Sequence, residues 1–169
     1  MSRIKRVYLD MDDVLINFTQ GCVDLFGKPF DENDVKFCWR KIGSSEGWWK
    51  NLPPFDNAHE FIRDLVVLSH EHSFEVHILS GTPNANTAEC EMQKMECVKM
   101  NIPTIHPSRV HFCKSKSKHM YADAFSILVD DRESNIENWK NAGGIGMLHN
   151  STTHCLSNVL TDIRSLLSE

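Results

Sequence analysis

The sequence predicts an α/β protein in which a parallel β-sheet lies between helices. Short runs of β-forming residues alternate with segments of helical periodicity, which is typical of repeated βαβ units. Two of the apolar runs end directly in clustered acids, Asp10-Met11-Asp12 and Asp130-Asp131. Parallel strands present their carboxyl ends at one edge of a sheet, where open α/β sheets bind ligands. We therefore expect these acids to lie together.

The apolar runs and the turn residues between them define the expected elements. We expect strands at residues 7–9, 74–79, 110–113, 125–129 and 145–148. We expect helices at residues 17–26, 84–100, 134–139 and 156–167, and another that begins after Asp56 or Asn57. The spacing of Ser134 and Glu137 predicts a capping box at the start of its helix.

Residues 18–55 differ in texture from the rest of the chain. They mix charged residues with aromatic ones, and no sustained period of either kind runs through residues 28–55. We interpret residues 18–55 as a small cap inserted after the first strand, and residues 1–17 and 56–169 as the core domain. A hydrophobic cluster under a long loop is the alternative interpretation for Phe37 and Trp39.

Composition narrows the class of protein. The net charge of −5 argues against general nucleic-acid binding, which favours a basic surface. No apolar run approaches the roughly 20 residues of a membrane span, so no membrane partner is expected. The six cysteines contain no Cys-x-x-Cys pair, and we expect free thiols in a reducing cytoplasm.

Four strand ends bring chemically active residues to the predicted sheet edge. They carry Asp10 and Asp12, Ser80 followed by Gly81, the basic 114–118 segment, and Asp130 with Asp131. Two acidic clusters form a site for a hard cation, and oxygen ligands favour Mg²⁺ over zinc or copper. A serine, a glycine amide and one lysine can hold a phosphate. The combination predicts phosphoryl chemistry.

This order of motifs resembles the haloacid dehalogenase (HAD) superfamily of phosphohydrolases, which have a Rossmann-like core, over essentially the whole chain. The matching stretches are Asp10-Met11-Asp12-Asp13-Val14, Ile78-Leu79-Ser80-Gly81, Lys118-His119-Met120-Tyr121-Ala122 and Leu128-Val129-Asp130-Asp131. Lys114 and Lys116 remain alternatives to Lys118. Within the superfamily, the chain most resembles the 5′(3′)-deoxyribonucleotidases in Asp10-Met11-Asp12-x-Val14-Leu15-x-x-Phe18, in Trp49-x-x-Leu52-x-Pro54 and in Asp130-Asp131-Arg132. Asp13 stands where those enzymes usually carry glycine.

The resemblance implies a role for each motif. Asp10 would be the nucleophile and Asp12 the acid and base, with Mg²⁺ held by Asp10, the Asp12 backbone carbonyl and Asp130. Ser80 and Lys118 would bind the phosphate oxygens. Asp131 would orient a metal-bound water or the lysine, although a simple role at the start of a helix is an equal alternative.

The resemblance also implies a small phosphate ester as substrate, with a nucleoside monophosphate favoured. Phe18, Trp48 and Trp49 are the candidates for contact with the base, and Gly81 for contact with the phosphate. One of the two tryptophans is expected to pack into the cap instead. Another small phosphate ester, a nucleic-acid 3′-phosphate and a non-catalytic binding role stay open, and the chain could form a homodimer.

Overall fold

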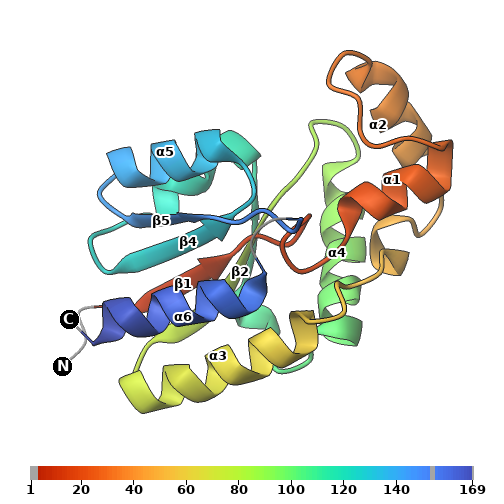
Figure 1. The fold of residues 1–169 in the computed structure, drawn as a ribbon. Helices are drawn as coiled ribbons and strands as arrows, with labels where there is room; N and C mark the ends of the chain where they lie inside the picture. The colour runs from red at the N-terminus through yellow and green to blue at the C-terminus, as the bar shows by residue number, and fades with distance from the viewer. Residues whose placement is uncertain (1–3, 153–154, 169) are drawn as a thin grey trace.

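The sheet of this computed structural model has five parallel strands and confirms the predicted α/β fold (Figure 1). The structure describes residues 4–152 and 155–168. In spatial order the strands are β3 (Val110–Cys113), β2 (Glu75–Gly81), β1 (Arg6–Leu9), β4 (Ser126–Asp130) and β5 (Ile145–Leu148). The chain runs outward from β1 through β2 and β3, and then returns to the other side of β1. The strand order therefore reverses at β1, which is where open sheets form their ligand crevice.

The register of β1 against β4 aligns the two acidic strand ends. Leu9 pairs with Val129, and the Asp10 amide donates a 2.9 Å hydrogen bond to the Val129 carbonyl. Asp10, directly after β1, and Asp130, the last residue of β4, consequently lie at the same level of the sheet. On its other side β1 pairs with β2, where Leu9 is opposite Ile78. The sheet thus positions the acids through backbone hydrogen bonds.

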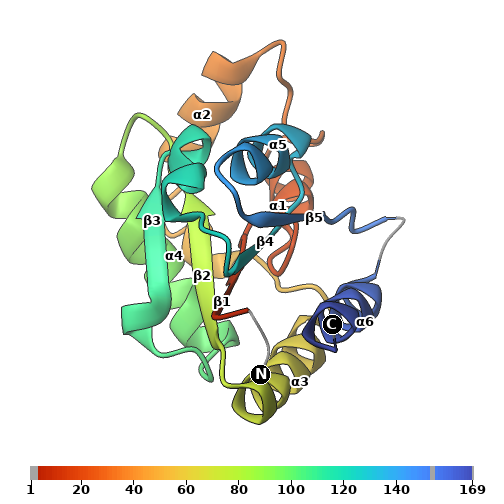
Figure 2. The ribbon, with the colours of Figure 1, turned by 90° about the vertical axis from the view of Figure 1, so that its left-hand side faces the viewer.

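Helices cover both faces of the sheet (Figures 1 and 2). The α-helices are α1 (Phe18–Phe26), α2 (Val35–Gly43), α3 (Ala58–His72), α4 (Thr87–Asn101), α5 (Glu133–Asn141) and α6 (Leu156–Leu167), and the 3₁₀ helices are η1 (Trp49–Asn51), η2 (Pro107–Arg109) and η3 (Ser115–Tyr121). Buried residues of α3, α4 and α6 join one large core. Residues of α5 and η3 form a smaller core on the opposite face.

The central strand β1 is apolar from Val7 to Leu9 because both of its faces are covered there. Val7 and Leu9 belong to the large core, whereas Tyr8 points to the smaller one and packs edge-on against Trp139 of α5. This alternation follows from the two-residue repeat of a strand. The continuous run that ends at Asp10 is therefore what a buried parallel strand requires.

The segment of residues 18–55 contains α1, α2 and η1 and is called the cap below. Figure 1 shows α1 and α2 away from the sheet, beyond β1. The expectation that no regular period runs through residues 28–55 was wrong for α2, in which Val35, Cys38, Trp39 and Ile42 follow helical spacing. Basic residues between these positions hid the pattern.

One local prediction at the carboxyl edge was also wrong. The capping box of Ser134 and Glu137 does not form, because α5 already begins at Glu133. Asp130 replaces it: its Oδ1 accepts a 2.9 Å hydrogen bond from the Arg132 amide ahead of the helix. The basic 114–118 segment leads from β3 into the 3₁₀ helix η3. This turn decides which lysine faces the site.

The cysteines and the helix lengths bear on the expectations of free thiols and of no membrane span. All six cysteines are free, and four of them are buried. Within residues 4–152 and 155–168, no helix has both the length and the apolar character that crossing a bilayer requires.

Candidate active site

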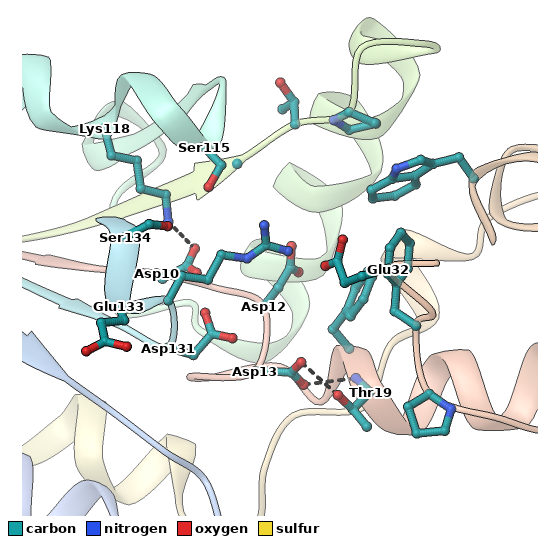
Figure 3. A pocket seen from close by; sticks show the side chains of 18 of the residues that line it. Asp10, Asp12, Asp13, Thr19, Glu32, Ser115, Lys118, Asp131, Glu133 and Ser134 are labelled. Atoms are coloured by element: carbon teal, nitrogen blue, oxygen red, sulfur yellow. Dashed lines mark hydrogen bonds and ion pairs between the residues drawn. The ribbon is translucent and has the colours of Figure 1, made fainter. Parts of the chain in front are cut away.

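The acids that end β1 and β4 lie together at the predicted sheet edge. Asp10 and Asp130 are both buried. The Met11 amide donates a 2.8 Å hydrogen bond to Asp10 Oδ1, which holds this carboxylate at the start of the turn. Asn135 of α5 donates to both oxygens of Asp130 at 3.0 Å. Figure 3 shows Asp10, Asp12 and Asp131 around one cavity.

Lys118 lies between these two carboxylates. Its Nζ is 2.6 Å from Asp10 Oδ1 and 2.7 Å from Asp130 Oδ2. Burial alone would lower the pKa of this ammonium, but the charges of Asp10 and Asp130 raise it above its ordinary value. Lys114 instead donates to the loop before α4, and Lys116 is exposed. Of the three candidate lysines, the structure brings only Lys118 to the acids.

Asp131 completes a cluster that could hold a metal ion. Asp10, Asp130 and Asp131 each offer an oxygen, and these atoms lie within 4.8 Å of one another. Burial, together with the charges of Asp10 and Asp130, raises the pKa of Asp131 to about 8. Besides burial, negative charge crowds this carboxyl, and a divalent cation would relieve that crowding. An all-oxygen donor set fits Mg²⁺.

The fit differs from the set Asp10, Asp12 and Asp130 expected from the sequence. Both oxygens of Asp130 already accept hydrogen bonds, from Lys118, Asn135 and the Arg132 amide. Asp131 lines the cavity, whereas Asp130 does not. Asp131 therefore adds an oxygen that lines the cavity to the cluster, and Asp130, a member of the same cluster, also bonds Lys118.

Lys94 of α4 is a site residue that sequence reasoning missed. Its buried Nζ is 2.5 Å from Asp12 Oδ2, and it donates to Ser80 Oγ at 2.9 Å and to the Gly81 carbonyl at 2.8 Å. The same ammonium lies 4.4 Å from the ring centroid of Trp49. A signal existed in the sequence, because Cys90, Lys94 and Cys97 follow helical spacing. A lysine within a buried stripe of a helix needs an acidic partner.

Asp12 has one committed and one free oxygen. Its Oδ2 pairs with Lys94, whereas its Oδ1 is buried and has no hydrogen-bond partner among the described residues. Burial and the nearby Asp10 raise the pKa of Asp12, although Lys94 opposes this shift. A carboxyl group with a raised pKa can hold a proton and give it up, as a general acid must.

The phosphate-binding serine expected from the sequence lies behind the cavity wall. Ser80 is fully buried, accepts its hydrogen bond from Lys94 and is not among the lining residues. Gly81 and Ser115 line the cavity instead. A Cβ on Gly81 would lie 3.3 Å from the Ser115 side chain, so glycine permits this close approach. Ser115 is thus a second hydroxyl candidate that the sequence did not indicate.

The cavity has a volume of about 600 Å³ and extends from Asp10 to the aromatic side chains of the cap. Phe18 and Trp49 line it as expected, and Phe30 and Trp39 join them. Trp48 does not: its indole N–H faces the Gly21 carbonyl at 3.4 Å, and its ring packs edge-on against Phe18. Trp48 is therefore part of the interior of the cap and does not line this cavity.

Asp13 connects the acidic turn after β1 to the cap. Its φ of +56° lies in the left-handed region, which explains why glycine suits this position. Its carboxylate accepts hydrogen bonds from the Thr19 amide at 2.9 Å and the Thr19 hydroxyl at 2.8 Å, both in the first turn of α1 (Figure 3). The strained residue thus holds the helix that carries Phe18.

Comparison with solved structures identifies the fold. No protein-family model and no curated protein matches the sequence. A haloacid dehalogenase-like family hydrolase from Xanthomonas campestris superposes with a TM-score of 0.65 and 11% identity, over 99% of this chain and 93% of that one. The fold is that of the haloacid dehalogenase-like hydrolases.

Two other solved structures of this fold extend the comparison. A haloacid dehalogenase-like family hydrolase from Streptococcus pneumoniae has a TM-score of 0.58 at 11% identity, over 95% of this chain and 91% of that one. A HAD family enzyme from Bacteroides thetaiotaomicron, solved as a magnesium complex, has a TM-score of 0.53 at 16% identity, over 87% and 93% of the two chains. The chain therefore shares its architecture with haloacid dehalogenase-like hydrolases of similar length.

The backbone at Asp13 generates a prediction about stability. Asp13→Ala loses both bonds to Thr19 and keeps a Cβ at positive φ, whereas Asp13→Gly loses the bonds but relieves the strain. Because a left-handed residue with a Cβ costs roughly 1–2 kcal/mol, Asp13→Gly should be more stable than Asp13→Ala by about 1 kcal/mol in urea unfolding. Equal stabilities of the two variants would show that the turn is not strained.

Proposed function

We propose that this protein is a magnesium-dependent phosphomonoesterase that forms an aspartyl-phosphate on Asp10, and that its substrates are nucleoside monophosphates. The observation that carries the proposal is the arrangement of Asp10, Asp131 and Lys118 at one end of an open cavity. A nucleophilic carboxylate, a cation site and a fixed ammonium are the parts that phosphoryl transfer requires. The aromatic wall at the other end supports a flat leaving group.

Mg²⁺ would be held by Asp10 and Asp131, with the Asp12 backbone carbonyl as a further expected ligand. When bound, it would offset the repulsion between the anionic nucleophile and the anionic phosphate. Lys118 would stabilise negative charge on the phosphoryl oxygens, and it already holds Asp10 in place. Asp130, through its bonds to Lys118 and Asn135, would keep that ammonium oriented.

The reaction then has two steps. An Asp10 oxygen bonds to phosphorus while the bond from phosphorus to the leaving oxygen breaks, and Asp12 donates its proton to that oxygen. In the second step Asp12 takes a proton from water, the water oxygen bonds to phosphorus, and the Asp10 carboxylate is released. The unpartnered Oδ1 of Asp12 is the atom suited to carry the proton.

The location of the aromatic residues supports the choice of substrate. Phe18, Trp39 and Trp49 line the part of the cavity that a nucleobase would enter. We keep residues 18–55 as the cap and residues 1–17 and 56–169 as the core domain. A cytoplasmic location and a homodimer stay predictions from the sequence.

Replacement of the nucleophile tests the reaction. Asp10→Asn should lower turnover of dUMP by roughly 10⁴-fold or more, because no covalent intermediate can form. The fold should persist, since the amide oxygen can still accept the hydrogen bonds of Lys118 and Met11. Saturating Mg²⁺ should raise the Tm of the wild type by several degrees and that of the variant by less.

The matched control for this test is Asp56→Asn, which removes an exposed carboxylate that does not line the cavity. This variant should behave like the wild type in both assays. Multiple turnover by verified Asp10→Asn protein would rule out Asp10 as the nucleophile.

Two tryptophans of the cap, the half-buried Trp39 and the buried Trp48, test the substrate class. Trp39→Ala removes a ring from the cavity wall, whereas Trp48→Ala removes one from the interior of the cap. Base stacking contributes roughly 1–3 kcal/mol per contact, so Trp39→Ala should lower kcat/KM for dUMP about tenfold to a hundredfold. It should largely spare p-nitrophenyl phosphate, which is too short to reach the cap.

Trp48→Ala should lower Tm but leave the ratio of the two kcat/KM values unchanged. If folded Trp39→Ala also leaves this ratio unchanged, the nucleotide proposal fails. Hydrolysis of another small phosphate ester would then be the better account of the site.

A further inference from the structure

A second cavity, of about 240 Å³, adjoins the candidate active site. Trp39, Trp49 and Pro83 line both cavities. The other walls of the second cavity come from α2 of the cap and from the start of α4 with the loop before it. A leaving group that reaches Trp39 and Trp49 from Asp10 therefore meets this second space at its far end.

The chemistry of the second cavity differs from that of the first. Val35 and Ile42 supply apolar surface, and Asn84 and Asn86 supply uncharged amides. Among the described residues that line it, Glu89 is the only formally charged one, and none is a lysine or arginine. An anionic group would find no cation there, whereas an uncharged group with hydrogen-bonding atoms would find partners.

The amides of this cavity divide into one committed group and two free ones. Both polar atoms of the Gln93 side chain have partners. Its Oε1 accepts a 3.1 Å hydrogen bond from the Trp49 amide, and its Nε2 donates a 2.9 Å hydrogen bond to Glu89. The side chains of Asn84 and Asn86 have no hydrogen-bond partner among the described residues. Each offers a donor and an acceptor, the pair that complements the edge of a heterocyclic base.

The backbone places Asn86 toward the cap. Its φ of +54° is left-handed, and its side chain does not cap α4. The side chain approaches α2, because a Cβ on Gly43 would lie 3.1 Å from Asn86 Nδ2. Glycine at the end of α2 thus leaves room for this amide at the cavity wall.

We propose that the second cavity binds the end of the leaving group farthest from the phosphate, and that this end is the uncharged, hydrogen-bonding edge of a planar ring. The indoles of Trp39 and Trp49 contact the ring, and Asn84 and Asn86 discriminate its edge. In a nucleoside monophosphate this edge belongs to the base. The inference rests on the proposed function, because the ring arrives as part of a phosphate ester.

Two variants and one control test this role. Ala85→Phe fills the cavity from its exposed loop, and Asn86→Gly removes an amide while keeping a residue that accepts positive φ. Asn158→Ala removes an exposed amide from α6 and serves as the control. For each protein, kcat and KM are measured on dUMP, dCMP, dAMP, dGMP and p-nitrophenyl phosphate, after Tm confirms folding.

Ala85→Phe should raise KM for the nucleotides about tenfold while kcat/KM for p-nitrophenyl phosphate stays unchanged. Asn86→Gly should reduce the ratio of kcat/KM between the best and the worst base about tenfold, since a good amide–base pair discriminates by that order. Asn158→Ala should change neither quantity.

The possible failures are separable. If the wild type hydrolyses no phosphate ester, both the proposed function and this inference fall. If the wild type hydrolyses nucleotides but folded Ala85→Phe keeps its nucleotide KM, or Asn86→Gly keeps the base ratio, only the role of the second cavity is refuted. An equal loss on p-nitrophenyl phosphate in Ala85→Phe would also refute it, because the effect would then lie in the first cavity.

Discussion

The site depends on the neutralisation of crowded carboxylates by two buried lysines. Asp10, Asp12, Asp130 and Asp131 follow two neighbouring strands, and each would lose hydration at this edge of the sheet. Isolated buried charges are costly unless they are paired and hydrogen-bonded. Lys118 meets this requirement for Asp10 and Asp130, and the acids in turn keep its ammonium charged.

The second lysine extends this constraint to the cap. Lys94 bonds Asp12 and Ser80, and its ammonium faces the ring of Trp49. The preceding residue, Gln93, accepts a hydrogen bond from the Trp49 amide. One turn of α4 therefore holds both the proposed proton donor and the wall of the substrate cavity. A displacement of this turn of α4 would therefore move the partners of both Asp12 and Trp49.

The elements that sequence predicted best are those in which local pattern and burial agree. The buried strand before Asp10 is a short apolar run that ends in acids, and such a run has few alternatives in an α/β protein. Lys118 could be favoured only by resemblance, since three lysines share its segment. The turn of η3 makes the choice, because it buries Lys118 and leaves Lys116 exposed.

The residues that sequence reasoning missed or misplaced depend on contacts between distant segments. Lys94 lies 82 residues from Asp12, and its partner follows from how α4 packs on the sheet. Asp130 and Asp131 are adjacent, yet Asp130 is the last residue of β4 and is held by Asn135, whereas Asp131 follows the strand and reaches the cavity. Likewise, Trp39 lines the cavity, whereas the ring of Trp48 packs inside the cap.

The proposed reaction requires a covalent phosphate at Asp10. A single turnover of dUMP, quenched with acid and followed by peptide mass mapping, tests this claim most directly. The account predicts a phosphorylated peptide that contains Asp10 and that disappears when the quench is delayed past turnover. Full release of product with no phosphorylated peptide at any time, or phosphate on a different residue, would contradict it.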